Sequence, residues 1–143
     1  MIRAMRRPVG FAIAVVFVAL LAVPALAATG KDRLVGDCTH SQIKPKQIVL
    51  ACADANAVVL HVKWSSFGAA KAAGTGTYSV NDCKPNCAAG TFKDYPVKLT
   101  ASDAKHCADG DVDDYMSLLL AFVGTPPPAT RSPLKVALYC PIG

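Results

Sequence analysis

The sequence predicts an all-β fold: a disulfide-stabilised antiparallel β-sandwich or small barrel of six to seven strands, preceded by a signal peptide. Three observations predict it. Apolar and polar residues alternate along several short runs, and turn-forming residues separate those runs at regular intervals. All six cysteines of the chain lie beyond an apolar N-terminal leader, as in small exported domains held by disulfides.

The N-terminus has the three parts of a secretory signal peptide. MIRAMRR is basic and contains no acid, an apolar run follows over residues 8–24, and Ala25-Leu26-Ala27 forms a small-x-small cleavage site. We expect cleavage after Ala27, which leaves residues 28–143 as a single secreted, extracellular domain. The alternative is an uncleaved anchor, because Val9–Ala28 is nearly long enough to span a bilayer. In that case the protein meets the membrane only through this segment.

The charge of the full chain, +5, is a poor guide to its partners, because three of its fifteen basic residues lie in the predicted signal peptide. The remaining chain has twelve Lys and Arg against ten Asp and no Glu, a net charge of +2. A surface of mixed charge is not the electrostatic footprint of a nucleic-acid-binding protein. We therefore expect no nucleic-acid partner.

The first two predicted strands come from runs with period-two alternation. In Ile48–Cys52, every second residue shares one apolar face. In Val58–Trp64, alternation predicts one inward set and one outward set. The inward set is Val58, Leu60, Val62 and Trp64, and the outward set is Val59, His61 and Lys63.

Four further runs complete the strand set: Gly74–Val80, Thr91–Thr100, Met116–Val123 and Leu134–Cys140. The glycines of the first run are typical of close backbone approach. Met116–Val123 is also compatible with a buried helical turn, because short apolar runs are ambiguous. Ser65–Ala73 is compatible with a short helix, which Gly68 disfavours. The proline-rich Gly124–Pro133 is predicted to be a stiff surface loop.

The six cysteines permit several pairings, of which order and spacing favour Cys38–Cys52, Cys83–Cys87 and Cys107–Cys140. Cys83 and Cys87 enclose a Lys-Pro-Asn turn. A zinc site would require a second cysteine hook, and a redox centre usually has two residues between its cysteines at a helix start. We therefore interpret this pair as a structural cross-link and expect no metal and no cofactor.

The motifs between Lys44 and Lys98 resemble those of a family of small secreted actinobacterial proteins. They read KPKQIVLACADAN, WSSFGAAKAAGTGTY, NDCKPNCAAGTF and YPVKLT. In that group Pro-x-x-Ile-x-Leu-x-Cys leads to Asp-x-Asn, and Trp-x-x-aromatic-Gly, Asn-Asp-Cys-x-Pro-x-Cys-Ala-x-Gly and Tyr-Pro-Val follow. Phe67 stands where many of these proteins carry a second Trp, and the C-terminal third matches less clearly. The resemblance implies secretion and a disulfide-bearing β domain, and it brings no catalytic residues.

Two groups of polar side chains are candidates for binding. Asp109, Asp111 and Asp113 alternate as the ligands of calcium loops do, although Asp114 and Leu120 occupy the positions where an EF-hand requires Gly and Glu. This makes them a weak calcium candidate and favours a solvated acidic turn. Asp54 and Asn56 follow a predicted strand, where they form either a binding site or an Asx turn.

The aromatic residues and one lysine supply the remaining candidates. Four aromatic residues are candidates for a platform that binds a sugar or a peptide: Trp64, Phe67, Tyr78 and Tyr95. Alternation places Trp64 in the core, and Phe67 and Tyr95 are the better surface candidates. Lys84 lies inside the Cys83–Cys87 turn, where a proteinase-inhibitor-like module would present it to a trypsin-like pocket. No serine lies in a nucleophile elbow.

The function that these features favour is non-catalytic recognition of an extracellular protein or an envelope polymer. One alternative is the inhibitor-like module. The other is a small secreted hydrolase that uses Asp54 or His61.

Overall fold

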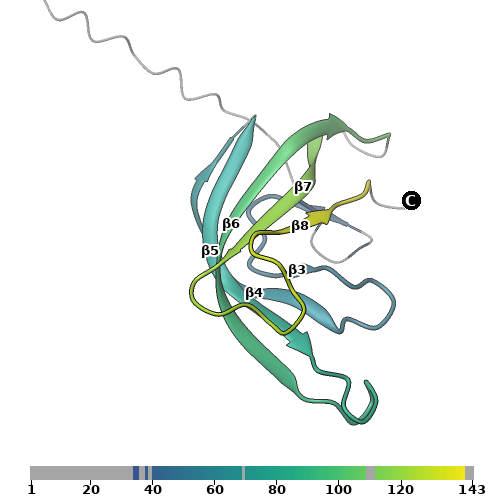
Figure 1. Ribbon diagram of the computed structural model, residues 1–143. Coiled ribbons are helices and arrows are strands. Elements are labelled where there is room, and N and C mark those ends of the chain that lie inside the picture. The colour runs from purple at the N-terminus through teal and green to yellow at the C-terminus, as the bar shows by residue number, and fades with distance from the viewer. Residues whose placement is uncertain (1–33, 36–37, 39, 69, 109–111, 141–143) are drawn as a thin grey trace, which may run out of the picture.

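The computed structural model describes residues 34–35, 38, 40–68, 70–108 and 112–140, and every regular element in these ranges is a β-strand (Figure 1). The predicted all-β class is therefore confirmed. The predicted signal peptide and its cleavage site lie outside the described residues. Within the described ranges, no helix has the length and apolar character that a membrane crossing requires. The strands are β1 (Leu34–Val35), β2 (Ser41–Gln42), β3 (Ile48–Val49), β4 (Ala57–Phe67), β5 (Lys71–Asn81), β6 (Phe92–His106), β7 (Asp113–Phe122) and β8 (Leu134–Ala137).

The last six strands form one antiparallel sheet in which each strand pairs with the next along the chain, in the order β3-β4-β5-β6-β7-β8. Figure 1 shows that the long strands curl, so that the sheet forms a half-barrel. In the short ribbon of β1 and β2, strand β1 contacts both β3 and β7, which are not neighbours in the sheet. Of the two predicted architectures, the curled sheet corresponds to the barrel.

Both helical alternatives are wrong, because the residues concerned pair with neighbouring strands. Met116–Val123 lies almost entirely in β7, whose residues are in continuous register with β6. In Ser65–Ala73, β4 continues to Phe67 and β5 begins at Lys71, so the segment is a hairpin. Strand pairing satisfies backbone groups that a short helix in this position would leave open.

The predicted assignment of the β4 side chains to an inward and an outward face is only partly correct. Val59 was expected outside, yet it is fully buried in the same core cluster as Val62. The register with β5 shifts between Leu60 and Lys63, and His61 has a φ of 54°. The local irregularity is a β-bulge, which inserts a residue and reverses the alternation. His61 is exposed as predicted, and Trp64 packs against the core.

Two glycines in β5 allow the bulged part of β4 to approach closely. A Cβ atom at Gly74 would lie 2.6 Å from the carbonyl oxygen of Lys63. A Cβ atom at Gly76 would lie 3.0 Å from a methyl carbon of Val59 and 3.1 Å from the carbonyl oxygen of Leu60. The close backbone approach predicted from the glycines of this strand is therefore present.

Each strand from β3 to β7 contributes fully buried side chains to the core, of which Tyr115 is the largest. Phe67 packs edge to face against both Trp64 and Tyr115. Its ring centroid lies 5.2 Å from that of Trp64 and 5.6 Å from that of Tyr115. The indole Nε1 of Trp64 donates to the carbonyl oxygen of Pro45 at 2.9 Å, which satisfies its polar group.

All three predicted cysteine pairs are at disulfide distance: Cys38–Cys52, Cys83–Cys87 and Cys107–Cys140. The first ties the chain before β2 to the segment after β3. The second closes a tight loop between β5 and β6, where the two Cα atoms are 3.8 Å apart. The third joins the end of β6 to the residues after β8.

Candidate binding site beside the Cys83–Cys87 loop

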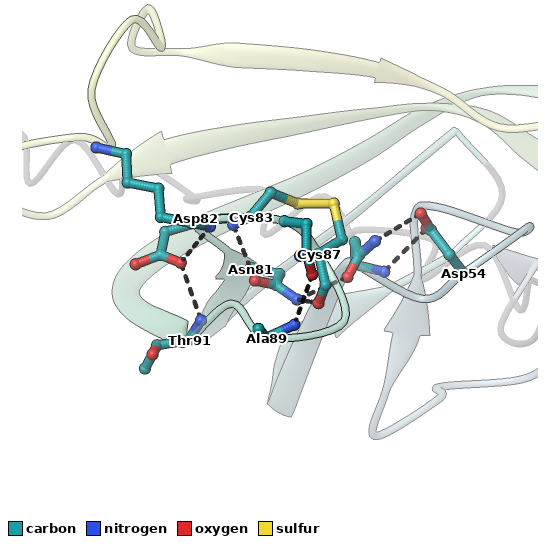
Figure 2. The surroundings of a disulfide bond; sticks show 10 residues. Asp54, Asn81, Asp82, Cys83, Cys87, Ala89 and Thr91 are labelled. Carbon is teal, nitrogen blue, oxygen red and sulfur yellow. Dashed lines mark hydrogen bonds between the residues drawn. A yellow bond between two sulfur atoms is a disulfide. The ribbon is translucent and has the colours of Figure 1, made fainter.

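The loop between β5 and β6, residues 82–91, is built around the side-chain amide of Asn81 (Figure 2). This amide donates to the carbonyl oxygen of Cys87 at 2.8 Å and to Oδ1 of Asn56 at 2.9 Å. Its own Oδ1 accepts from the backbone N–H of Cys83 at 2.9 Å. Asn81 therefore bonds to both cysteine residues of the disulfide and to the turn before β4. We call residues 82–91 the Cys83–Cys87 loop.

Gly90 completes this arrangement because no side chain fits at its position. A Cβ atom there would lie 2.0 Å from Oδ1 of Asn81 and 2.9 Å from the backbone nitrogen of Cys83. Real Cβ atoms do not approach other heavy atoms so closely. The glycine in the sequence NDCKPNCAAG is thus required by the packing of the loop against Asn81.

Asp82 fixes the other side of the loop. One carboxylate oxygen, Oδ1, accepts from the backbone N–H of Thr91 at 2.9 Å and from that of Lys84 at 3.2 Å (Figure 2). The hydrogen bond from Thr91 lowers the pKa of Asp82 most, followed by the hydrogen bond from Lys84. The positive charges of Lys93 and Lys84 lower this pKa further. Asp82 is therefore an ionised carboxylate at neutral pH, held in one place by the backbone.

Asp54 and Asn56 form the Asx turn that their sequence predicted. The backbone N–H of Asn56 donates to Oδ1 of Asp54 at 3.2 Å, and the Asn56 side chain also donates to this carboxylate. Asn56 in turn accepts from Asn81 through its side chain and through its backbone carbonyl. Figure 2 shows the resulting chain of polar contacts from Asp54 to the disulfide loop. In this structure the two residues orient Asn81.

A cavity of about 250 Å³ lies beside the Cys83–Cys87 loop. One wall comes from β5 and β6, where Tyr78 is paired with Tyr95 and Val80 with Lys93. Lys84 and Asp82 border the cavity from the disulfide loop. The opposite wall is formed by the loop between β7 and β8, through Pro127 and Pro128. The proline-rich segment predicted to be a stiff surface loop thus lines a pocket.

The two tyrosines rest on a shared aromatic support. The ring of Phe122 packs edge to face against both tyrosines. Its centroid lies 5.7 Å from that of Tyr78 and 6.2 Å from that of Tyr95. Tyr78 is only 7 % exposed, and burial raises the pKa of its phenol. Within the described part of the chain, the Tyr78 hydroxyl has no hydrogen-bond partner, although the residue lines the cavity.

The pocket carries a small excess of positive charge. Lys84 and Lys93 bring two ammonium groups and Asp82 one carboxylate, and both lysines are exposed. Among the described residues neither lysine forms an ion pair, so both ammonium groups are available to a ligand. The site therefore combines positive charge with two phenol rings and two prolines.

The other predicted site residues lie elsewhere. Phe67 packs against the core and does not line this pocket, whereas Tyr95 does. His61 is exposed at the bulge of β4. Of the calcium candidates, Asp109 and Asp111 lie outside the described residues, and a carboxylate oxygen of Asp113 lies 3.6 Å from Nδ1 of His106. Across the part of the chain that the structure describes, no group of three or more potential ligands could hold a metal ion.

Sequence patterns identified Lys84 and Tyr95 and included Tyr78 among the aromatic candidates, but they did not identify Lys93 or Asp82 as pocket residues. The motif NDCKPNCAAG contains the Asn-Asp pair before Cys83, but its sequence indicates no role for the pair. The hydrogen bonds now explain that pair, since Asn81 and Asp82 each hold one side of the loop. Lys93 could have been found from hairpin register, because it faces Val80 across the sheet.

No family model, curated protein or solved structure matches this chain.

Proposed function

We propose that this protein is an exported, non-catalytic recognition domain that binds an extracellular partner or an envelope polymer through the pocket beside the Cys83–Cys87 loop. The observation that carries the proposal is the pocket itself. Its lysines, Lys84 and Lys93, are presented by a disulfide-closed loop and by the start of β6, where Lys93 is paired with Val80 of β5. Groups held on rigid elements bind with a smaller loss of conformational entropy.

The pKa shifts of two pocket groups, Asp82 and Tyr78, favour binding over acid–base catalysis by these groups. A general acid or base works best when its pKa lies near the working pH. Here the pKa of Asp82 is lowered and the pKa of Tyr78 is raised, so both move away from neutrality. These shifts keep each group in a single charge state, which suits a fixed recognition surface.

The disulfides support an extracellular setting. Three cross-links in one small domain are typical of proteins that fold in an oxidising compartment. The apolar leader of the sequence supports the same route. An exported domain with a charged pocket meets polymers, proteins and surfaces outside the cell.

The inhibitor-like alternative has one observation in its favour, the exposure of Lys84 inside a disulfide loop. A proteinase binds its substrate as an extended strand. Cys83, directly before Lys84, has a φ of 51°, which interrupts an extended backbone at that point. The pocket therefore supports recognition better than it supports presentation of a cleavable bond.

Co-sedimentation with envelope material from the source organism tests the proposal. The oxidised domain should pellet with the envelope, and Lys84→Ala combined with Lys93→Ala should leave it in the supernatant. The matched control, Lys98→Ala with Lys135→Ala, removes the same charge from exposed positions outside the pocket and should pellet normally. Equal pelleting of both double variants, or no pelleting of the wild type, would contradict the proposal. Inhibition of a trypsin-like proteinase that disappears in Lys84→Ala would support the alternative instead.

A further inference from the structure

We propose that the pocket beside the Cys83–Cys87 loop takes a carboxylate-bearing sugar ring, so that the partner is an acidic saccharide. This inference rests on the proposed function and names its ligand class. It is drawn from four properties of the pocket: its size, its paired lysines, the fixed carboxylate of Asp82, and the phenol groups of Tyr78 and Tyr95.

The size of the cavity limits the ligand to one ring. Its volume of about 250 Å³ equals the liquid volume of roughly eight water molecules. Cavities that enclose drug-sized ligands are larger, up to about 1,000 Å³. One substituted six-membered ring fits this space, and the rest of a polymer would extend into solvent past the exposed Lys84 and Lys93.

The two lysines indicate that the ring carries a negative charge. Lys84 enters from the disulfide loop, and Lys93 enters from β6, opposite Val80. Across the described residues, neither side chain forms an ion pair of its own. Two ammonium groups that approach one cavity from different elements can both donate to a single carboxylate, in charge-assisted hydrogen bonds.

Asp82 argues for a sugar and against an acidic peptide. Its carboxylate is held at the rim by the N–H groups of Lys84 and Thr91 through one oxygen, and a carboxylate has capacity for further donors. A sugar offers hydroxyl groups that donate to it. An acidic peptide offers further carboxylates, which Asp82 would repel.

The phenol groups complete the match to a hydroxylated ring. The hydroxyl of Tyr78 makes no hydrogen bond within the described part of the protein, and the residue lines the cavity, so its hydroxyl is open to a hydrogen bond with a ligand. Tyr95 and the two prolines supply apolar surface for the C–H bonds of a ring. The cavity therefore offers both neutral and charged contacts to one ring.

Titration of the oxidised domain, followed by amide NMR shifts, tests this inference with defined probes. Glucuronate should shift the amides of Lys84, Thr91 and Tyr95 saturably, and glucose should bind the same site at least about fivefold more weakly. Lys84→Ala with Lys93→Ala should weaken glucuronate binding about tenfold. Lys98→Ala with Lys135→Ala should leave it unchanged. Tyr78→Phe, which keeps the ring, should weaken it about threefold.

Three outcomes would overturn the ligand class. These are equal binding of glucose and glucuronate, tighter binding of glucose 6-phosphate than of glucuronate, and tighter binding of hexaglutamate at these amides. If glucuronate fails while envelope pelleting still depends on Lys84 and Lys93, the saccharide inference falls and the recognition function stands. If pelleting is also independent of these lysines, both fall.

Discussion

At Asn81, one side-chain amide holds two turns and a disulfide in a single arrangement, and Gly90 leaves the space that this amide occupies. We expect Asn81→Ala to lower the free energy of unfolding by about 2 kcal/mol, because it removes three hydrogen bonds around the loop. Gly90→Ala should cost about as much, through the clash with Oδ1 of Asn81. Urea unfolding of the oxidised protein measures both losses.

The double variant Asn81→Ala, Gly90→Ala tests whether Gly90→Ala destabilises the protein through the clash with Asn81 or through the loss of glycine flexibility. In Asn81→Ala the closest atom to a new Cβ at position 90 is gone. The cost of Gly90→Ala should therefore be smaller in that background, by about 1 kcal/mol. Strict additivity of the two losses would show that Gly90 is needed for another reason.

Asp82 makes stability depend on pH in the acid range. Its pKa in the folded protein lies below the ordinary value of 3.8, because backbone N–H groups and two lysines favour the ionised form. The stabilisation is present in full above the unfolded pKa and is lost as the pH falls through the folded pKa. We expect Asp82→Asn to be less stable than wild type at neutral pH, with a difference that shrinks toward zero in strong acid. Urea unfolding across the pH range measures this, and a pH-independent difference would contradict it.

At the level of single elements, alternation located the long strands but not the irregularities within them. The predicted runs in β5, β6 and β7 lie inside the observed strands or overlap them closely. The face of Val59 was missed because the bulge at His61 depends on pairing with β5, which no local pattern records. The strands β1 and β2 are only two residues each and leave no periodic signal.

Like the strands, the candidate site could be predicted from the sequence only in part. Spacing identified the Cys83–Cys87 pair, and residue type identified Lys84 and Tyr95. The pocket needs one further fact, the return of the β7–β8 loop to the face that carries Lys93 and Tyr95. That contact joins segments distant in sequence, so local patterns do not predict it.

The close approach of β4 and β5 gives a prediction at this scale. Gly74→Ala should destabilise the protein by about 2 to 3 kcal/mol, because the new Cβ meets a backbone carbonyl that cannot move without disturbing the bulge. Gly76→Ala should cost about 1 kcal/mol, since its nearest neighbour is a side-chain methyl group of Val59. Thermal and urea unfolding of the two variants provide the comparison. A larger loss at Gly76 would show that the backbone of β4 yields more easily than its side chains.

At the scale of the whole molecule, we expect the three disulfides to contribute differently to the free energy of unfolding and to binding. Cys107–Cys140 and Cys38–Cys52 close loops of 33 and 14 residues, and they join the ends of the curled sheet to its body. Cys83–Cys87 closes a loop of only 4 residues, which contains Lys84. Cross-links over longer loops restrict the unfolded chain more. The shortest cross-link is therefore the one whose effect should be seen mainly in the pocket.

Replacing each cysteine pair by alanine tests this division. We expect losses in the free energy of unfolding of about 4, 3 and 2 kcal/mol for Cys107–Cys140, Cys38–Cys52 and Cys83–Cys87, in the order of loop length. Binding to the envelope fraction should follow the opposite order. The Cys83→Ala, Cys87→Ala variant should bind most weakly while remaining folded, because Lys84 loses its fixed position beside Asp82. Urea unfolding and co-sedimentation on the same samples measure both quantities. Unchanged binding by this variant would show that the disulfide serves the fold alone.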